Sequence, residues 1–262
     1  MGELVFVGLG LGPGGVSQAG LEELKGCGKV FAETYTAPVE KGMLPELAKL
    51  IGKDIALLGR KDVEDGKLIL MEASRGRCSI LVPGDPMVAT THVDLRLRAV
   101  ERGIVTKIIH AASIGTAAAG LLGLQSYKFG RTTTLPFWKP GYEPTSPYDV
   151  VEANRNEGLH TLVLLDIDAE GGAAMTATQG MAQLIALEAK LGRGVFKADT
   201  LACVVARAGH DDVLVKAGEI TVLAREDFGR PPHCIVIPGK LHFMESGALV
   251  ALAGAPKTIL KD

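Results

Sequence analysis

Short apolar runs alternate with amphipathic stretches along the first half of the chain, and this pattern predicts strands alternating with helices. The run ELVFVGLG over residues 3–10 predicts a buried strand, and Ser17 is placed to cap a helix that continues to Leu24. Strands joined by helices in this way run parallel, so we expect an α/β domain with a mostly parallel sheet and helices on both faces. The further strands are expected over residues 29–33, 55–58, 78–84 and 105–109, and the further helices over residues 44–51, 62–75, 90–102 and 113–122.

The composition changes at residue 127, where a proline-rich stretch begins. Residues 127–149 hold four of the 13 prolines and the only tryptophan, so we place a domain boundary at the start of this stretch. The N-terminal α/β domain then covers residues 1–126 and the C-terminal α+β domain residues 127–262. Because the later strands follow one another with short connections, we expect a mixed sheet there. The strands are expected over residues 160–168, 200–209, 213–216 and 233–239, and the helices over residues 176–191 and 243–253.

The composition is that of a folded globular protein, with 47% apolar and 22% charged residues. A formal net charge of −2 leaves no domain-wide basic field, which argues against a nucleic-acid partner bound through its phosphates. No apolar run is long enough to span a bilayer, and strand-like sequence begins at Leu4, so we expect a cytoplasmic protein without a membrane partner. Four cysteines without a C-x-x-C pair are expected as buried free thiols rather than as a disulfide or metal site: Cys27, Cys78, Cys203 and Cys234.

A glycine-rich stretch, GLGLGPGG over residues 8–15, lies between the first strand and the first helix. In this position glycines let a ligand approach the backbone. A dinucleotide fingerprint fits from Gly10 to Gly15, although Pro13 removes one backbone donor inside the turn, and Glu33 would be its acidic residue. A nicotinamide cofactor and a purely structural turn therefore both remain open at this point.

The stretch PGDPMVATTH over residues 83–92 follows a strand directly. Ligands of open α/β sheets bind at the carboxyl ends of the strands, and clefts between domains are favoured ligand sites. Asp85 offers a carboxylate that could accept from an ammonium group or a ribose hydroxyl. The alternative is that Asp85 only begins a turn.

The glycine-rich loop, the PGDP motif and the two α/β domains together resemble the tetrapyrrole (corrin/porphyrin) methylase superfamily. Within it, further stretches are similar to the diphthine synthase family, and they extend over nearly the whole chain in that family's order. One local departure is the GPGG that follows GLGL, where diphthine synthases usually have polar or acidic residues. The similar stretches are FAETYT (31–36), PGDPMVATTH (83–92), IIHAASI (108–114), YKFG (127–130), PTSPYDVVEAN (144–154), GLHTLVLLDI (158–167), DTLACVVARAG (199–209), REDFGRPPH (225–233) and PGKLHFMES (238–246).

The resemblance implies that S-adenosylmethionine binds in a cleft between two α/β domains of the tetrapyrrole methylase type. The positions that match the family's cofactor contacts are mostly apolar or small, which suits an adenine ring that needs flat apolar walls and few polar groups. These cofactor-binding candidates are Leu11, Asp85, Val88, Ser113, Ile114, Leu165, Ala208 and His233.

The resemblance also implies the reaction, which is methylation of the amino group of 3-amino-3-carboxypropyl-histidine on translation elongation factor 2 to give diphthine, in diphthamide biosynthesis. A sulfonium methyl is already activated, so alignment of an in-line attack supplies much of the rate, on the order of 7–11 kcal/mol. An α-amine has a pKa of about 7.7–8.0, and burial beside a positive sulfonium favours its neutral form. We therefore assign no catalytic residue and expect no single indispensable general base.

The family resemblance further implies a homodimer, and no histidine or cysteine spacing indicates a metal. Glu33 and Tyr35 are candidates for substrate contact, with packing as the alternative. Lys128, Arg131 and Arg207 are candidates for the acceptor's carboxylate, with a solvated face as the alternative. Two other functions remain open: methylation of a tetrapyrrole or ribosomal RNA, and a non-catalytic module that binds a nucleotide or the elongation factor.

Overall fold

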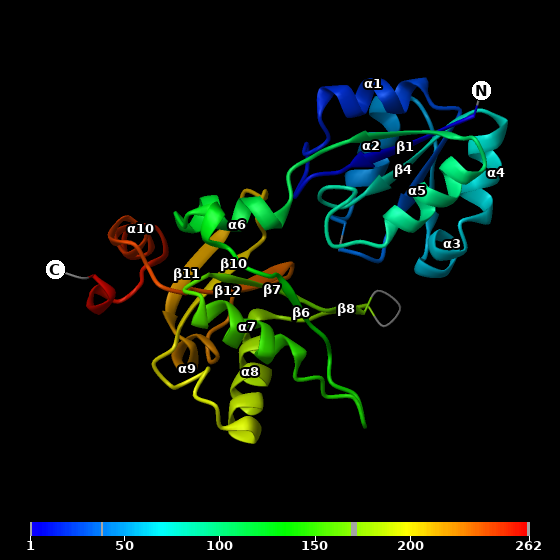
Figure 1. Cartoon of the computed structure of the whole chain (residues 1–262). Coiled ribbons are helices and arrows are strands. Elements are labelled where there is room, and N and C mark those ends of the chain that lie inside the picture. The colour runs from blue at the N-terminus through cyan, green and yellow to red at the C-terminus, as the bar shows by residue number, and fades with distance from the viewer. Residues whose placement is uncertain (1, 38, 169–171, 261–262) are drawn as a thin grey trace. The chain divides into compact units, whose positions relative to one another are not determined.

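The computed structural model describes residues 2–37, 39–168 and 172–260, and the chain folds into two compact units (Figure 1). Unit 1 runs to Ile114, and unit 2 begins at Gly115. This division lies before the boundary at residues 126/127 that the composition suggested, because helix α6 (Ile114–Leu122) packs within unit 2. Gly123, at the end of α6, approaches Ala248 so closely that a Cβ on the glycine would lie 2.4 Å from the alanine Cβ.

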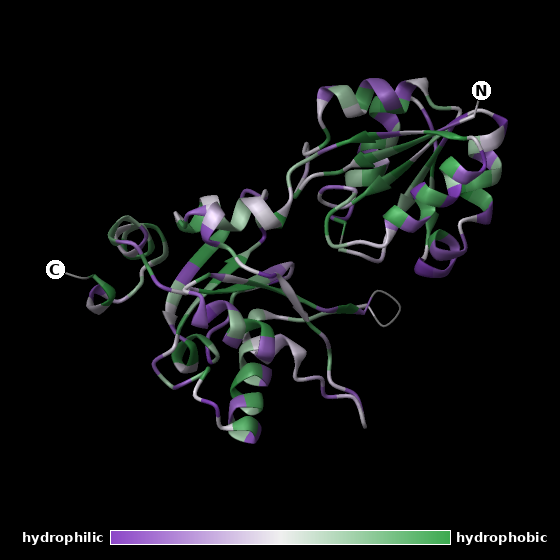
Figure 2. Ribbon diagram, in the orientation of Figure 1, coloured by the Kyte–Doolittle hydropathy of each residue, from purple (hydrophilic) through white to green (hydrophobic). Residues whose placement is uncertain are grey.

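Unit 1 is built on a five-stranded sheet, sheet A, with the strand order β3-β2-β4-β1-β5. All its strand pairs are parallel, which confirms the expected parallel sheet. The central strands are continuous apolar runs because both of their faces are covered by helices. Figure 2 shows these strands as largely hydrophobic. The strands are β1 (Glu3–Gly8), β2 (Lys29–Glu33), β3 (Ile55–Leu58), β4 (Arg77–Val82) and β5 (Val105–Ile109).

Successive residues of β1 contribute to different cores on the two faces of sheet A. Leu4 and Phe6 belong to one apolar cluster, together with residues of α4 (Lys67–Arg75) and α5 (His92–Glu101). Val5 and Val7 belong to another cluster, together with residues of α1 (Gln18–Gly26) and α2 (Met43–Ile51) (Figure 1). The period-2 alternation of a strand thus anchors a helical layer on each face.

The helices of unit 1 begin and end where local chemistry dictates. Ser17 caps α1 (Gln18–Gly26) as expected, because its hydroxyl accepts from the backbone N–H of Gly20 at 3.1 Å. The single helix expected over residues 62–75 is instead two, α3 (Arg60–Asp65) and α4, because Gly66 between them has a φ of 66°. The remaining helix, α2 (Met43–Ile51), lies as predicted.

Unit 2 contains a five-stranded mixed sheet, sheet B, with the strand order β11-β10-β12-β7-β6. The β6–β7 pair is parallel and the other pairs are antiparallel, which confirms the expected mixed sheet. A small hairpin adds the antiparallel pair β8 (Ile167–Asp168) and β9 (Ala173–Ala174). The strands of sheet B are β6 (Thr133–Leu135), β7 (Thr161–Leu165), β10 (Leu201–Ala206), β11 (Leu214–Glu219) and β12 (His233–Ile237).

The proline-rich stretch after residue 126 is more ordered than its composition suggested, since it contains β6 and the start of helix α7 (Ser146–Asn156). Pro147 lies in the first turn of α7, where a missing N–H costs nothing. Tyr148 and Val151 of this helix are fully buried in the core over sheet B. The other helical segments of unit 2 are α8 (Ala177–Leu191), α9 (Ile220–Leu223), α10 (Phe243–Ala253), η1 (Ser126–Lys128) and η2 (Lys257–Ile259).

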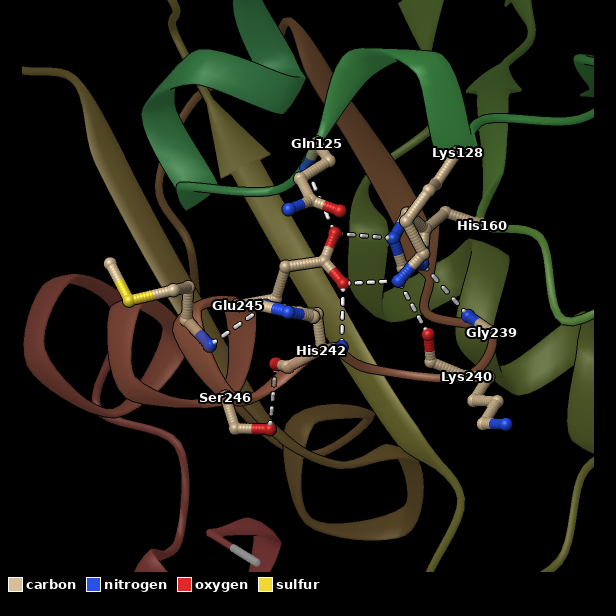
Figure 3. A network of polar contacts seen from close by, with 9 residues as sticks. Gln125, Lys128, His160, Gly239, Lys240, His242, Glu245 and Ser246 are labelled. Carbon is tan, nitrogen blue, oxygen red and sulfur yellow. Dashed lines mark hydrogen bonds and ion pairs between the residues drawn. The ribbon is translucent and has the colours of Figure 1, made fainter.

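A buried carboxylate, that of Glu245 in α10, joins several segments of unit 2 (Figure 3). Its Oε1 accepts from the backbone N–H of Gln125 and from Nε2 of His160, both at 2.9 Å. Its Oε2 accepts from the backbone N–H of His242 at 2.8 Å and from the ammonium of Lys128. Burial alone would raise the pKa of Glu245, but these four donors together lower it to about 2.

His160 completes the network as a neutral ring. Its Nδ1 accepts from the backbone N–H of Gly239 at 3.0 Å, so the proton lies on Nε2, which donates to Glu245. Burial lowers the pKa of His160, in keeping with this neutral form. The network therefore holds one fixed negative charge against the ammonium of Lys128, in the interior of unit 2.

We predict that Glu245→Gln destabilises the protein by about 3 kcal/mol at pH 7, because its amide NH₂ would face donors that need an acceptor. The low folded pKa means that this contribution is fully present above the ordinary glutamate value of about 4.3. It is lost as the pH falls toward the folded value of about 2. Urea unfolding should therefore show a smaller difference in the free energy of unfolding between wild type and variant at pH 3 than at pH 7.

Glu64→Gln is the matched control, since Glu64 pairs with Arg60 at 3.8 Å between side chains that are 50% and 57% exposed. Its loss should change the free energy of unfolding by less than about 1 kcal/mol. If the difference in unfolding free energy between wild type and Glu245→Gln stays constant from pH 7 to pH 3, the stabilisation does not come from the ionised carboxylate.

Candidate functional site

The carboxyl ends of the parallel strands of sheet A meet at one edge of unit 1. Strand β1 lies between β4 and β5, so the loops that follow these strands are neighbours. We call residues 9–15, 83–91 and 110–113 together the three-loop edge. In open α/β sheets this edge is where ligands bind.

Backbone hydrogen bonds join the first two loops of the three-loop edge. The N–H of Gly10 donates to the carbonyl of Gly84 at 3.1 Å, and the N–H of Gly84 donates back to Gly10 at 2.9 Å. A Cβ on Gly10 would lie 2.7 Å from the carbonyl oxygen of Gly15, because the loop folds back on itself. Gly10 also has a φ of 71°, which a side chain would strain. Gly10 therefore allows the loop to fold back on itself while its backbone pairs with the PGDP loop.

Asp85 joins the second and third loops of the edge through its carboxylate, which is almost fully buried. Its Oδ2 accepts from Nδ1 of His110 at 2.7 Å and from the backbone N–H of Ala111 at 3.3 Å. Its Oδ1 accepts from the backbone N–H of Met87 at 3.0 Å. Burial alone would raise the pKa of Asp85, but these hydrogen bonds outweigh it and lower the pKa, so the group is a carboxylate at neutral pH.

The other cofactor-binding candidates of unit 1 lie at the same edge or directly after it. Leu11 is half-buried in the glycine-rich loop, and Val88 is 48% exposed in the PGDP loop. Ser113 is buried, and the half-buried Ile114 begins α6. The predicted residues of unit 1 therefore lie on the three loops of this edge or directly after them.

The three candidates of unit 2 share one edge of sheet B. Leu165 is the last residue of β7, and Ala208 lies just beyond the end of β10. His233 is the first residue of β12, which runs antiparallel to both strands and pairs with Ala206 there. All three are buried or nearly so, which fits a wall better than a reactive group.

Both ring nitrogens of His233 are already engaged within unit 2. Nδ1 accepts from the backbone N–H of Ala177 at 3.1 Å, and Nε2 donates to the carbonyl of Arg230 at 3.0 Å. Burial lowers the pKa of His233, so the ring is neutral and fixed. Any contact of His233 with a ligand would therefore use its backbone or the face of its ring.

Glu33, a candidate for substrate contact, closes a turn instead. Its fully buried carboxylate accepts from the backbone N–H groups of Tyr35 and Thr36, each at 3.2 Å, and from the hydroxyl of Thr36. Burial raises the pKa of Glu33. These local donors leave Glu33 a packing role and do not favour the ribose contact that a nicotinamide site would need.

Two of the three cationic candidates are paired internally. Lys128 contacts Glu245, and the buried Arg207 contacts the carboxylate of Asp212 at 2.7 Å. Arg131 is exposed and stays a candidate for the acceptor's carboxylate.

The four cysteines are buried and unpaired, as expected. Burial raises the pKa values of Cys78 and Cys234 to about 12, so neither is a thiolate near neutral pH. Within residues 2–37, 39–168 and 172–260, no group of three or more His, Cys, Asp or Glu side chains could hold a metal ion. In the same ranges no helix is long and apolar enough to cross a membrane.

The sequence interpretation missed the contact of His110 with Asp85, because it considered this histidine only as a possible metal ligand. His110 follows β5 directly, and strand ends at this edge are ligand-binding positions, so its place in IIHAASI was a usable signal. What the sequence could not show is that the imidazole reaches the carboxylate of a loop that precedes it by 25 residues.

Comparison with known proteins bears directly on this arrangement. Residues 3–224 match the family model of the tetrapyrrole (corrin/porphyrin) methylases. The chain is 44% identical over 259 residues to the diphthine synthase of Methanothermobacter thermautotrophicus, covering 98% of both chains. It is 45% identical over 250 residues to that of Methanocaldococcus jannaschii, covering 94% of this chain and 97% of the relative. A crystal structure of diphthine synthase superposes with a TM-score of 0.89 at 37% identity, over 98% of each chain.

Two α/β units, with a strand-end edge built from the glycine-rich and PGDP loops and a fold shared with the matched family, define a methyltransferase. Identity above 40% over nearly the full length of both chains narrows the assignment from methyltransferases in general to one family. The chain belongs to the diphthine synthase family of the tetrapyrrole methylases.

We predict that Gly8→Ala destabilises the protein by about 1–3 kcal/mol, the usual cost of overpacking. A Cβ at Gly8 would lie 2.6 Å from both the Cβ of Ala111 and the carbonyl oxygen of Gly84, so the loops must separate. Hydrogen exchange at the amides of Gly84 and Ala111 should accelerate along with the fall in unfolding free energy.

Gly76→Ala is the matched control, because Gly76 has an extended φ of −175° and a Cβ added there would have no heavy atom within 4 Å. This variant should be neutral or slightly more stable than wild type. Equal effects of the two substitutions would show that the three-loop edge is not closely packed around Gly8.

Proposed function

We propose that the protein transfers methyl groups from S-adenosylmethionine to the amino nitrogen of 3-amino-3-carboxypropyl-histidine on translation elongation factor 2. This is the diphthine-forming reaction of diphthamide biosynthesis. The observation that carries the proposal is the similarity to diphthine synthases over 98% of both chains, which includes every loop of the three-loop edge. The cytoplasm, where translation factors act, is the proposed location.

The residues of the three-loop edge fit the cofactor. An ionised carboxylate offers about four lone-pair positions, and the protein donors of Asp85 use three of them. The remaining position on Oδ1 can accept from a ribose hydroxyl or from the cofactor's ammonium. Val88 and Leu11 supply apolar surface beside it, as an adenosyl group requires.

We propose that Ser113 and Ile114 complete the unit 1 contacts, and that Leu165, Ala208 and His233 contact the same cofactor from unit 2. When bound, the cofactor supplies a methyl group on sulfur that is already activated toward nucleophiles. The task of the protein is then to orient the acceptor amine in line with that methyl and to exclude water. Six of the eight cofactor-binding candidates are small or apolar, which suits such a role. The two exceptions are Asp85 and His233.

The direct test mixes the protein, methyl-labelled S-adenosylmethionine and elongation factor 2 that bears the unmethylated extension on its histidine. We expect label in this factor and none in the factor without the extension. Label in a tetrapyrrole or in ribosomal RNA instead would contradict the proposed acceptor, while the protein would still be a methyltransferase. Failure to bind S-adenosylhomocysteine in calorimetry would favour a non-catalytic module.

We predict that Val88→Arg weakens S-adenosylhomocysteine binding about tenfold or more and S-adenosylmethionine binding further. The substitution removes apolar surface beside Asp85, and its positive charge repels the sulfonium. Calorimetric titration with both ligands measures the two effects separately.

Val93→Arg is the matched control, because Val93 is 50% exposed on α5 and lies outside the three-loop edge. Its affinity for both ligands should stay within about twofold of wild type.

Ala208→Leu tests the unit 2 contacts in the same titration, with the thermal midpoint as a check on folding. Unchanged affinity in a folded Ala208→Leu protein would remove unit 2 from the cofactor site.

The homodimer stays a prediction, which sedimentation equilibrium of the purified protein would check.

A further inference from the structure

The ring of His110 is largely exposed, in contrast to those of the buried His92, His160 and His233. Its side chain is 72% exposed, whereas the carboxylate partner, Asp85, is 8% exposed. The 2.7 Å contact joins Nδ1 to Oδ2. Among the described residues, Asp85 is the carboxylate that pairs with this ring, and nearby Lys107 pairs with Glu23 instead.

The proton positions in this pair follow from the acceptor. The pKa of Asp85 is lowered, so its carboxylate can only accept, and Nδ1 of His110 must donate. In the neutral ring, Nε2 is then an unprotonated acceptor on the exposed side. A buried carboxylate that fixes the tautomer and orientation of an accessible imidazole is the arrangement by which proteins hold a histidine base.

The position of the pair matches the site of the proposed reaction. Asp85 and Ser113 are proposed cofactor contacts, and His110 is hydrogen-bonded to the first and lies on the same short loop as the second. The backbone N–H of Ala111 also donates to Asp85, so two successive residues of the loop that carries His110 are fixed to one carboxylate. A group this close to the cofactor contacts lies where an acceptor amine would approach.

We propose that His110, oriented by Asp85, is the proton acceptor for the amine of the substrate; this rests on the proposed function. Nε2 takes a proton from the substrate ammonium and leaves a neutral amine. The nitrogen lone pair then forms the bond to the methyl carbon, while the carbon–sulfur bond breaks and its electron pair stays on sulfur. The exposed imidazolium returns its proton to water, so the base is regenerated.

A base at His110 differs from the expectation drawn from the sequence, which assigned none. Because an amine of pKa about 7.7–8.0 is partly neutral without help, removal of the base should slow the reaction and not abolish it. General bases typically contribute about 10²- to 10⁴-fold.

The test is His110→Asn, since the asparagine amide can keep the donor to Asp85 but offers no basic nitrogen. The readouts are S-adenosylhomocysteine affinity and the single-turnover rate of methyl transfer to elongation factor 2, each as a function of pH. We expect affinity within about twofold of wild type, a rate about 10²-fold lower, and a pH profile that follows the protonation of the substrate amine alone. His110→Ala should recover rate with added imidazoles, in order of their basicity.

His242→Asn is the control, because His242 is an exposed histidine that caps α10, beyond the end of β12 opposite to His233. It should match wild type in both readouts. A His110→Asn protein with the wild-type rate and pH profile would overturn the assignment, and so would a rate loss matched by an equal loss of cofactor affinity. A different outcome is a wild-type protein that binds the cofactor and fails to methylate elongation factor 2 that bears the unmethylated 3-amino-3-carboxypropyl group. That outcome would overturn the proposed function, and the role of His110 with it.

Discussion

The parallel pairing of β1 with β4 on one side and β5 on the other is the constraint on which the site depends. Parallel strands end at the same edge, so residues separated by many positions in the chain emerge side by side. Burial of β1 on both faces fixes its register, because a shift of one residue would exchange the two helical layers that pack on it. The positions of the glycine-rich, PGDP and His110 loops follow from this register.

Close approach at the edge is then a matter of side-chain volume. Gly8 leaves the space into which Ala111 and the PGDP loop fit, and the reciprocal backbone bonds between Gly10 and Gly84 hold the two loops together. Asp85 can reach the third loop only because this approach is possible. The GPGG stretch, residues 12–15, follows Gly10 and so lies outside the reciprocal bonds to the PGDP loop.

Much of this fold could be predicted from hydrophobic periodicity, since the strands of sheet A are short apolar runs between amphipathic helices. The same method failed at Gly66, because a single left-handed residue breaks a helix without changing the apolar pattern. It also predicted no helix over residues 146–156, where Pro147 occupies the first turn of α7. At the candidate site, Asp85 could be found from its motif. The contact with His110 could not, because a hydrogen bond across the sheet edge leaves no local periodic signal.

Glu245 and Asp85 both have lowered pKa values, so acidity does not distinguish a structural carboxylate from one that could bind a ligand. The arrangement of hydrogen-bond donors around each carboxylate does. Glu245 has two donors on each oxygen, so its four lone-pair positions are filled and nothing is left for a ligand. Asp85 has three protein donors and one open position, and one of its donors is an exposed imidazole. A saturated carboxylate can only hold its neighbours in place. An unsaturated one at a strand end has room for a further donor, such as one from a ligand, and this difference is the reason that we place the proposed chemistry at the three-loop edge.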